Sequence, residues 1–373
     1  MRLLLLAHAP VVHTQVWARA LAARGHEIRL LTLDAAPGAP HPGRAVGIRV
    51  PVTALRVASA VGEVRRELRD FRPDVTVAHF LPDYGFLAAL AGATPLFLVC
   101  WGSDLLLNAT RSPFHRARAR FTLSRADTVH VDAAVLADAA IRLGARKDRV
   151  WNRAWGVDVD ALAPSEPWAT RRARAGGRGV RLLWTRRLHS LYRPETFLDA
   201  LARLRGKGIP FSATIVGDGP LRASLEARAR AHGVTDAVRF TGWVGDAEIR
   251  AHLAAHDVYV SLSRSDSTSQ SLLEAMAAGL VPVVSDIEGN REWVGHRQDG
   301  YLVPGDDPEA VACAIAEIVG AAEIATESAG TDPLGDPGMV AARAQAKIAS
   351  RARFADTVGE TEARLVALST RAV

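Results

Sequence analysis

The chain has 373 residues, 49% of them hydrophobic and 23% charged, which is typical of a soluble globular protein long enough for two domains. The formal net charge of +6 favours anionic partners such as nucleotide diphosphates, acidic lipids or nucleic acid, although a generally Arg- and Ala-rich composition is the alternative explanation. Two cysteines inside apolar runs exclude a disulfide framework or a cysteine metal cluster and indicate a reducing compartment.

Targeting and membrane segments are not recognisable. The first apolar run, residues 3–6, is too short for the hydrophobic region of a signal peptide, and no segment reaches the roughly 20 apolar residues of a transmembrane helix. We therefore expect a cytoplasmic protein, with the inner face of the membrane as a second possible location. Few aromatic residues accompany the Arg clusters, so DNA or RNA is not an expected partner.

In the first half of the chain, short apolar runs alternate with helical patterns. Most of these runs are apolar at consecutive positions, as parallel strands covered on both faces require. The expected strands are 3–8, 27–32, 75–80, 96–101, 128–132 and 149–155, and the expected helices are 13–24, 57–71 and 133–143. This alternation predicts right-handed βαβ units in a doubly wound sheet.

The alternation stops at residues 158–178, which contain two prolines and two glycines and which we interpret as an interdomain linker. It then restarts with expected strands at 180–185, 212–217, 238–242, 258–263 and 281–286, and expected helices at 195–206, 221–232, 247–256 and 269–278. A mobile loop is expected at 321–338 and helix from 339 to about 368. The predicted fold class is α/β, with Rossmann-like domains at 1–160 and 161–349 and a C-terminal helix at about 350–373 packing back on the first.

The most informative run is 263–279. A strand ends at Ser263, a polar loop follows, and a helix begins near Ser269, so that hydroxyl side chains can cap the helix and leave backbone N–H groups pointing outward. Asp266 on the loop and Glu274 on the helix can both accept hydrogen bonds from sugar or ribose hydroxyls. The alternative is a capped core helix with one surface acid.

This region resembles a known family. The run D-x7-E-A-M-A-A-G-L-V-P-V-V that starts at Asp266, followed by D-I-E-G-N-R-E at 286–292, is similar to the donor signature of the retaining glycosyltransferases of family 4, which have the two-domain GT-B fold. The family usually has Glu at the first position, so Asp266 is one methylene shorter. The resemblance implies that Asp266 contacts the transferred sugar and Glu274 the ribose. It also implies donor contacts for the neighbouring residues Ser267, Thr268, Ser269 and Leu273.

Two further segments match the same family. Gly217 lies in its strand-to-helix turn of the second domain, and Trp243 with Val244 resembles the segment against which the nucleotide base packs; a strand end with a core Trp is the alternative. Asp158 and Asp160 spell the Asp-x-Asp metal motif of a different glycosyltransferase architecture. Their place at the domain junction argues against that role, so we expect no metal and no cofactor.

The departing diphosphate needs positive charge that is in place before the bond breaks. The family usually supplies an Arg and a Lys about five residues apart. Arg187 takes the Arg position, whereas Tyr192 occupies the Lys position. Arg193 could compensate by clamping phosphate bidentately, or Tyr192 could donate one hydrogen bond. Solvated surface charge is the alternative for Arg186, Arg187 and Arg193.

The first domain departs further from the family. The turn after its first strand lacks glycine, and His13 and Thr14 open a helix whose amino terminus is expected to face the cleft between the domains. Where many members have a His near the reacting sugar, this chain has Trp101 and Asp104. Trp101 could stack on a sugar face and Asp104 could reach a hydroxyl, but neither is a like-for-like replacement.

A basic stretch in the first domain, residues 111–121, carries four Arg and two Phe on an expected helix. Such a helix can lie on anionic lipid, and related enzymes often use lipid-linked acceptors. A solvated basic face is the alternative.

The preferred function is a retaining glycosyltransferase that moves a sugar from a UDP- or GDP-linked donor to a glycan, lipid-linked or small-molecule acceptor. Arg187, Asp266 and Glu274 are the candidate catalytic residues, and the first domain is expected to bind the acceptor. Two alternatives remain: an epimerase or phosphorylase on the same fold, and a non-catalytic nucleotide-sugar binder, which the missing Lys and His would suit.

Overall fold

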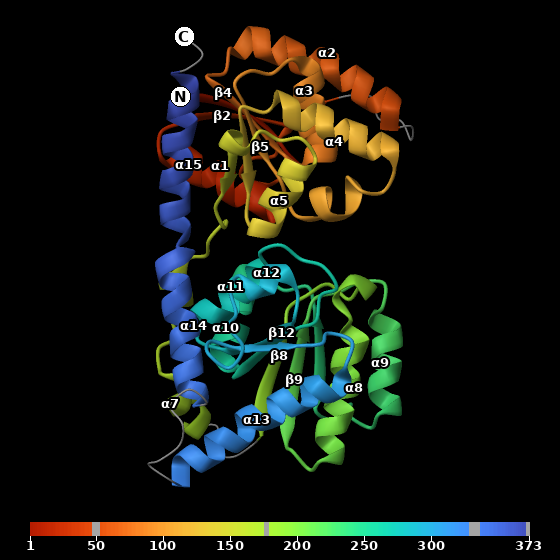
Figure 1. The fold of residues 1–373 in the computed structure, drawn as a ribbon, viewed down its shortest axis with the longest axis vertical. Coiled ribbons are helices and arrows are strands. Elements are labelled where there is room, and N and C mark those ends of the chain that lie inside the picture. Colours follow the sequence, from red (N-terminus) through yellow and green to blue (C-terminus); the bar gives the residue numbers. More distant parts are fainter. Residues whose placement is uncertain (47–52, 175–178, 328–335, 371–373) are drawn as a thin grey trace. The chain divides into compact units, whose positions relative to one another are not determined.

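The computed structural model describes residues 1–46, 53–174, 179–327 and 336–370. These residues form two compact units, one made of Met1–Ala154 and Ala355–Val373 and the other of Trp155–Phe354 (Figure 1). Each unit is built on one parallel sheet with helices over both faces. The predicted fold class is therefore confirmed. The domain bounds expected from the sequence are 160/161 and 349/350, whereas the two units divide at 154/155 and 354/355.

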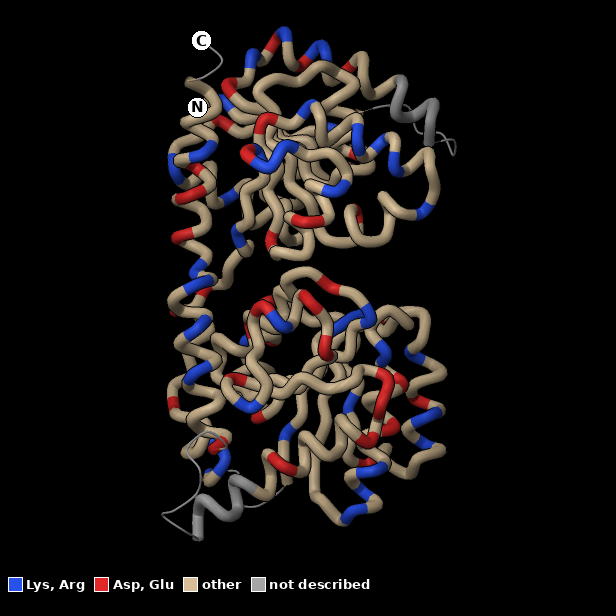
Figure 2. Tube along the Cα trace, viewed as in Figure 1, with Lys and Arg blue, Asp and Glu red and all other residues tan. Residues whose placement is uncertain are grey.

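The first unit holds a seven-stranded sheet in the order β3-β2-β1-β4-β5-β6-β7. Its strands are β1 Arg2–Leu6, β2 Glu27–Thr32, β3 Arg44–Ala45, β4 Val75–His79, β5 Leu96–Val99, β6 Thr128–Val131 and β7 Val150–Asn152. The interior strand β1 pairs in parallel with β2 and β4, and its four leucines are fully buried because both faces of the sheet are covered. Charged residues lie mostly on helices and turns (Figure 2).

Helices of the first unit connect these strands in sequence order, and the last one returns from the end of the chain. They are α1 Val12–Ala23, α2 Thr53–Phe71, η1 Phe80–Gly85, α3 Phe86–Ala91, η2 Asp104–Asn108, α4 Pro113–Arg125, α5 Ala134–Arg142, η3 Lys147–Arg149 and α15 Phe354–Ser369. Helix α15 is fastened to this unit through Glu362, whose carboxylate accepts from Arg24 at 2.6 Å and lies 2.9 Å from the ring of His26. Thr357 adds a buried hydrogen bond to the carbonyl of Ala154 at 3.1 Å.

The second unit holds a six-stranded sheet in the order β10-β9-β8-β11-β12-β13. Its strands are β8 Val180–Trp184, β9 Phe211–Val216, β10 Val238–Gly242, β11 Val258–Ser261, β12 Val281–Ser285 and β13 Tyr301–Val303. Its helices are α6 Val159–Leu162, α7 Trp168–Arg174, η4 Ser190–Tyr192, α8 Pro194–Gly206, α9 Arg222–Ala231, α10 Asp246–Ala255, α11 Gln270–Ala277, α12 Glu288–Arg291, α13 Pro308–Glu327 and α14 Pro337–Arg351.

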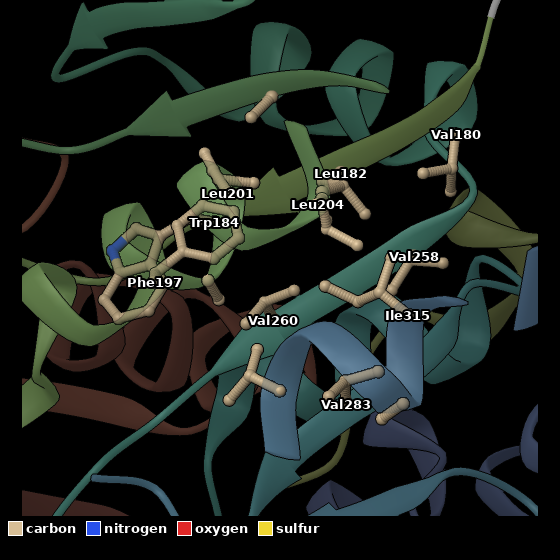
Figure 3. Packing of buried hydrophobic residues seen from close by; sticks show 14 of the residues in the cluster. Val180, Leu182, Trp184, Phe197, Leu201, Leu204, Val258, Val260, Val283 and Ile315 are labelled. Atoms are coloured by element: carbon tan, nitrogen blue, oxygen red, sulfur yellow. The ribbon is translucent and has the colours of Figure 1, made fainter. Parts of the chain in front are cut away.

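The core of the second unit packs one sheet face against α8 and α13. Figure 3 shows Val258, Val260 and Val283 of the sheet close to Ile315 of α13. On the α8 side, the ring of Trp184 stacks on a phenylalanine of that helix at 5.5 Å and 15°. Because Trp184 is the last residue of β8, this packing fixes the point at which the next turn leaves the sheet.

The predicted linker and loop were partly wrong. Residues 158–174 contain α6 and α7, and they are tied to the second unit by Trp168, which donates to the carbonyl of Asp257 at 2.9 Å, and by Arg171, which donates to that of Gly279 at 2.6 Å. Residues 321–327 of the predicted loop continue α13. Residues 175–178 and 328–335 lie outside the described part of the chain.

Both sheets have a point at which the strand order reverses, between β1 and β4 and between β8 and β11. In open parallel sheets, ligands bind beyond the carboxyl ends of the strands at such a point. We therefore expect a ligand site at the residues that follow β8 and β11. Among the helices of the described ranges, none combines the length and the apolarity that crossing a bilayer demands.

Candidate functional site

The turns after β8 and β9 are packed closely together at the carboxyl edge of the second sheet. A side chain at Gly219 would place its Cβ 2.4 Å from the carbonyl oxygen of Leu188, and one at Gly217 would place it 2.8 Å from that of Arg186. The N–H of Leu188 also donates to the carbonyl of Asp218 at 3.0 Å. The Gly-x-Gly spacing is thus needed to bring the two turns into contact.

The turn after β11 carries the hydroxyl residues that the sequence singled out. Ser269 is the N-cap of α11 and accepts from the N–H of Leu272, while Thr268 accepts from the indole N–H of Trp293 at 3.0 Å. Both side chains are buried, so their hydroxyls serve the fold. The backbone N–H groups of Ser267 and Ser269 have no acceptor within the described ranges, which leaves them available to a ligand.

Helix α12 presses against this turn from the next strand. A Cβ at Gly289 would lie 2.2 Å from the carbonyl oxygen of Ser267 and 2.6 Å from that of Asp266. Backbone cannot give way as a flexible side chain can. Gly289 therefore fixes the path of the Asp266–Ser267 backbone.

Arg186, the second residue after β8, reaches across the switch point to the turn after β11. Its guanidinium donates to Oδ2 of Asp266 at 2.6 Å and to the hydroxyls of Ser269 and Ser271 at 2.6 and 3.2 Å. Its side chain is only 12% exposed and that of Asp266 19%. The alternative of a solvated surface charge is therefore wrong for Arg186.

Tyr192 lies over the same guanidinium. The centre of its ring is 4.3 Å from the central carbon of Arg186, a cation–π contact. The short helix η4 holds Tyr192 in place, because its N–H donates to the carbonyl of His189 at 2.9 Å. The Tyr192 ring thus packs on the guanidinium of Arg186 and helps to hold it in place.

The other two arginines of the turn behave differently. Arg187 is exposed and makes no ion pair or hydrogen bond through its guanidinium with any described residue, so its charge is available to an anion. Arg193, in the left-handed backbone region at φ 51°, turns towards Asp306 at 3.8 Å, and its side chain is 15% exposed. Arg186 and Arg187 are thus adjacent in sequence but differ in their surroundings: Arg186 is bound by Asp266, whereas Arg187 is exposed.

Glu274 lies in α11 with no hydrogen-bond partner for its carboxyl group among the described side chains. Its pKa is raised to about 7, chiefly by burial and also by the negative charge of Asp246, and the guanidinium of Arg186 opposes both effects. Asp246 was not predicted as part of the site. It opens α10 directly after the Trp243–Gly245 turn, and its charge acts on the carboxyl group of Glu274.

Trp243 is 67% exposed although it follows a strand of the sheet, and Val244 beside it is half-buried. The alternative of a core Trp is therefore wrong; an open indole face suits stacking by a planar ring. Leu273 cannot take part through its side chain. It is fully buried, and its N–H already donates to the carbonyl of Ser269, so this prediction needs correction.

In the first unit, aromatic side chains gather at the carboxyl ends of β1, β4 and β5. The ring of Trp101 makes edge contacts with His13, His79 and Phe80 at centroid distances of 6.0, 5.9 and 6.4 Å. Phe80 has φ 69°, a strained backbone for a non-glycine residue that is often found at functional sites. Burial lowers the pKa of His79 to about 3, with His130 and His13 adding to the effect, so its ring is neutral.

Asp104 does not face a ligand, contrary to expectation. Its carboxylate is fully buried and accepts the backbone N–H groups of Leu81, Trp101 and Leu105 at 3.1, 3.0 and 2.9 Å. It joins the turns after β4 and β5 and so supports the Trp101 ring. Thr14 is likewise buried in the first turn of α1, and its hydroxyl has no hydrogen-bond partner within the described ranges.

The Asp-x-Asp motif is used by the fold. Asp158 caps α6 by accepting from the N–H of Ala161 at 3.1 Å, and Asp160 pairs with Arg353 at 2.6 Å. Over the ranges that the structure describes, no group of three or more His, Cys, Asp or Glu side chains is arranged to hold a metal ion.

The raised pKa of Glu274 predicts a pH-dependent stability. Its folded-state pKa of about 7 lies above the ordinary value of 4.5, so ionising it costs stability as pH rises between these values. Glu274→Gln stays neutral and should gain on wild type over this range, reaching about 3 kcal/mol above pH 7. Urea unfolding of both proteins between pH 4.5 and 8.5 measures the difference.

The exposed Glu288 in the same unit provides the matched control, since Glu288→Gln also removes one carboxylate. A stability gain for Glu274→Gln that does not grow with pH, or that Glu288→Gln reproduces, would contradict the shifted pKa.

Family comparisons divide the chain at the same place as the fold. The family model described as "Glycosyl transferase 4-like domain" matches residues 9–151, and the one described as "Glycosyl transferases group 1" matches residues 179–320. Each match falls within one of the two units.

Two relatives with similar sequences are named as GDP-mannose-dependent mannosyltransferases. A GDP-mannose-dependent alpha-(1-6)-phosphatidylinositol monomannoside mannosyltransferase of Mycobacterium tuberculosis is 33% identical over 175 residues, 44% of this chain and 45% of that protein. The chain therefore spans less than half the length of this relative. A GDP-mannose-dependent alpha-mannosyltransferase of the same species is 28% identical over 317 residues, 77% and 79% of the two chains.

Solved structures share the fold. HepE of Anabaena in complex with UDP matches with a TM-score of 0.76 and 20% identity, covering 98% of this chain and 100% of that one. A glycosyltransferase from Rickettsia africae matches with a TM-score of 0.78 and 14% identity, covering 98% of each chain. The predicted resemblance is confirmed: the chain belongs to the family 4 type of glycosyltransferases and has the GT-B fold.

Proposed function

We propose that this chain transfers a sugar, with retention of its anomeric configuration, from a nucleoside-diphosphate sugar to an acceptor. The observation that carries the proposal is the carboxyl edge of the second sheet, where an open indole, an unpaired guanidinium and one acid lie on the turns after β10, β8 and β11, and a second acid lies on α11. These belong to Trp243, Arg187, Asp266 and Glu274. A base needs a stacking surface and a diphosphate needs positive charge. The ribose and the sugar both need hydrogen-bond acceptors.

Each group of the donor has a candidate contact in the second unit. We assign the base to Trp243 and Val244, the ribose to Glu274, and the diphosphate to Arg187. The sugar is assigned to Asp266 and to the free N–H groups of Ser267 and Ser269. Arg193 and Tyr192 are left out of direct contact with the diphosphate, because one turns towards Asp306 and the other packs on Arg186.

The proposed chemistry needs no protein nucleophile. The acceptor oxygen forms its bond to the anomeric carbon on the face from which the diphosphate departs. A departing phosphate oxygen takes the acceptor proton, so the leaving group gains the proton and the pair of electrons of the broken bond. Arg187 stabilises the charge that develops on the phosphate. The ion pair of Asp266 with Arg186 supports this, since a carboxylate held by a guanidinium is a weak nucleophile.

Acceptor binding is assigned to the first unit, at the cluster of Trp101, His13 and Phe80. A carbohydrate could stack on these rings. The mannosyltransferase named above acts on a phosphatidylinositol mannoside, which makes a lipid-linked acceptor the leading choice over a free glycan. The relatives use GDP-mannose and the solved neighbour holds UDP, so either nucleotide suits the proposal.

A donor panel tests the function. Saturating the correct UDP-, GDP- or dTDP-sugar should stabilise the fold by mass action, by about 2.7 kcal/mol at a concentration of 100 times Kd, and should raise Tm in a thermal-shift assay. With an acceptor substrate present, Glu274→Ala should abolish transfer, because the ribose hydroxyls of the donor lose the carboxylate to which they donate hydrogen bonds. A flat response to every donor would count against the proposal. Turnover without an acceptor, or only with phosphate, would instead indicate an epimerase or a phosphorylase.

A glycine substitution tests whether the turn after β11 receives the donor. Gly289→Ala should push the backbone of Asp266 and Ser267 away and weaken donor binding about tenfold or more. Gly206→Ala at the end of α8 is the control, since a Cβ there meets no atom within 4 Å. Isothermal titration with the donor found in the panel measures both. Equal affinity in the two variants would exclude this turn from the donor site.

Helix α4 of the first unit supports a peripheral membrane contact. Arg111, Arg116 and Arg120 are exposed without ion pairs to any described residue, and Phe114 is 69% exposed among them. Figure 2 marks several basic residues along this helix. Beside it a groove of about 330 Å³, bounded by η2 and α5, has three arginines and no acidic residue in its lining. Basic and apolar side chains together suit an anionic lipid surface.

Vesicle co-sedimentation tests this contact. Wild type should pellet at low salt with phosphatidylcholine vesicles that contain phosphatidylglycerol and stay in the supernatant with phosphatidylcholine alone. Arg116→Glu with Arg120→Glu should abolish pelleting, whereas Arg66→Glu with Arg69→Glu on α2, an equal change in charge, should not. Wild type that stays in solution, or equal loss in both double variants, would overturn the proposal.

A further inference from the structure

The guanidinium of Arg186 is held from several sides at the switch point of the second sheet. Oδ2 of Asp266 and the hydroxyl of Ser269 each lie 2.6 Å from its nitrogens, and the Tyr192 ring covers it at 4.3 Å. The Ser271 hydroxyl, at 3.2 Å, is itself 2.7 Å from the buried hydroxyl of Tyr259 in β11. A side chain with this many partners has one orientation.

This placement has an electrostatic cost. The guanidinium lies at the amino terminus of α11, the positive end of the helix dipole, where an anion is normally preferred. Burying a charged pair also loses hydration that the pair recovers only when its geometry is good. A neutral side chain would fill the same space at lower cost, so the pair contributes more to geometry than to stability.

The ion pair with Arg186 fixes the orientation of the Asp266 carboxylate. Oδ2 of this carboxylate is occupied by Arg186, with the Ser263 hydroxyl 3.5 Å away, whereas Oδ1 has no partner among the described residues. The backbone on either side is fixed by Gly289. One oxygen is therefore anchored and the other is presented, next to the free N–H groups of Ser267 and Ser269.

We propose that Arg186 is a positioning residue for the sugar moiety of the donor, acting through Asp266. It fixes the carboxylate so that Oδ1 and the adjacent N–H groups meet the sugar hydroxyls in one arrangement, while the exposed Arg187 on the other side of the turn meets the diphosphate. The inference rests on the function proposed above, in which Asp266 contacts the transferred sugar. It assigns the two consecutive arginines to different parts of one donor.

The division of roles predicts a selective loss of affinity. Arg186→Gln removes the anchor of Asp266 and should weaken binding of the nucleoside-diphosphate sugar about tenfold or more, while the nucleoside diphosphate alone binds within about twofold of wild type. Arg187→Gln should weaken both ligands by similar factors. Titration calorimetry with UDP, GDP and their glucose and mannose conjugates measures these ratios. Parallel losses for both ligands in Arg186→Gln would overturn the proposal, since they would place the guanidinium on the diphosphate.

A double-mutant cycle tests whether Arg186 acts through Asp266. In the Asp266→Asn background, Arg186→Gln should change sugar-nucleotide affinity by less than about threefold, because the anchored carboxylate is already gone. Multiplicative losses would overturn the proposal. The double variant also avoids an unpaired buried charge, so it remains measurable if Arg186→Gln alone folds poorly. Arg186→Lys, which keeps one charged donor for Asp266, should recover part of the lost affinity for the sugar nucleotide.

Arg228→Gln is the matched control, because Arg228 also pairs with an aspartate, Asp199, in this case through two hydrogen bonds of 2.6 Å on the surface of the same unit. It should leave both affinities unchanged. Wild type that binds no nucleoside diphosphate at all would overturn the proposed function and this inference with it, and that result appears before any variant is made.

Discussion

Burial of both faces of a parallel sheet is the constraint on which each unit depends. Strands such as β4 and β12 have no exposed face on which to carry polar chemistry, so functional side chains gather at the strand ends. Because all strands run in the same direction, those ends meet at one edge. Residues as far apart as Arg186 and Asp266 are brought within 2.6 Å there, although 80 positions separate them in the chain.

The Arg186–Asp266 pair shows how side chains at the edge of the sheet are held in fixed positions. Sheet topology brings two turns together but does not fix the side chains on them. That task falls to close backbone contacts at Gly217, Gly219 and Gly289, and to a guanidinium with partners on three sides. The edge is thereby pre-organised, which lowers the entropy lost when a ligand is bound.

Much of this was predictable from the sequence, and the failures share a cause. Apolar runs placed eleven strands close to their observed positions, and the spacing from Asp266 to Glu274 indicated the donor region because local pattern and motif agree there. The separate directions of Arg186 and Arg187 were not predictable, since they depend on which side of a turn faces a distant helix. The expectations for Asp104 and for the segment around Trp168 were also wrong, because groups remote in sequence help to decide their roles: the N–H of Leu81 for Asp104 and the carbonyl of Asp257 for Trp168.

Helix α15 belongs to the first unit although the whole of the second unit precedes it in the chain. A ribosome delivers residues in order, so the first unit is begun first and completed last, after residues 155–354 have emerged. Until then the surfaces that receive Glu362 and Thr357 have no cover from this helix. Nascent chains of this protein thus pass through a stage in which the later unit is complete and the earlier one is not, and in that interval they are open to chaperones and proteases.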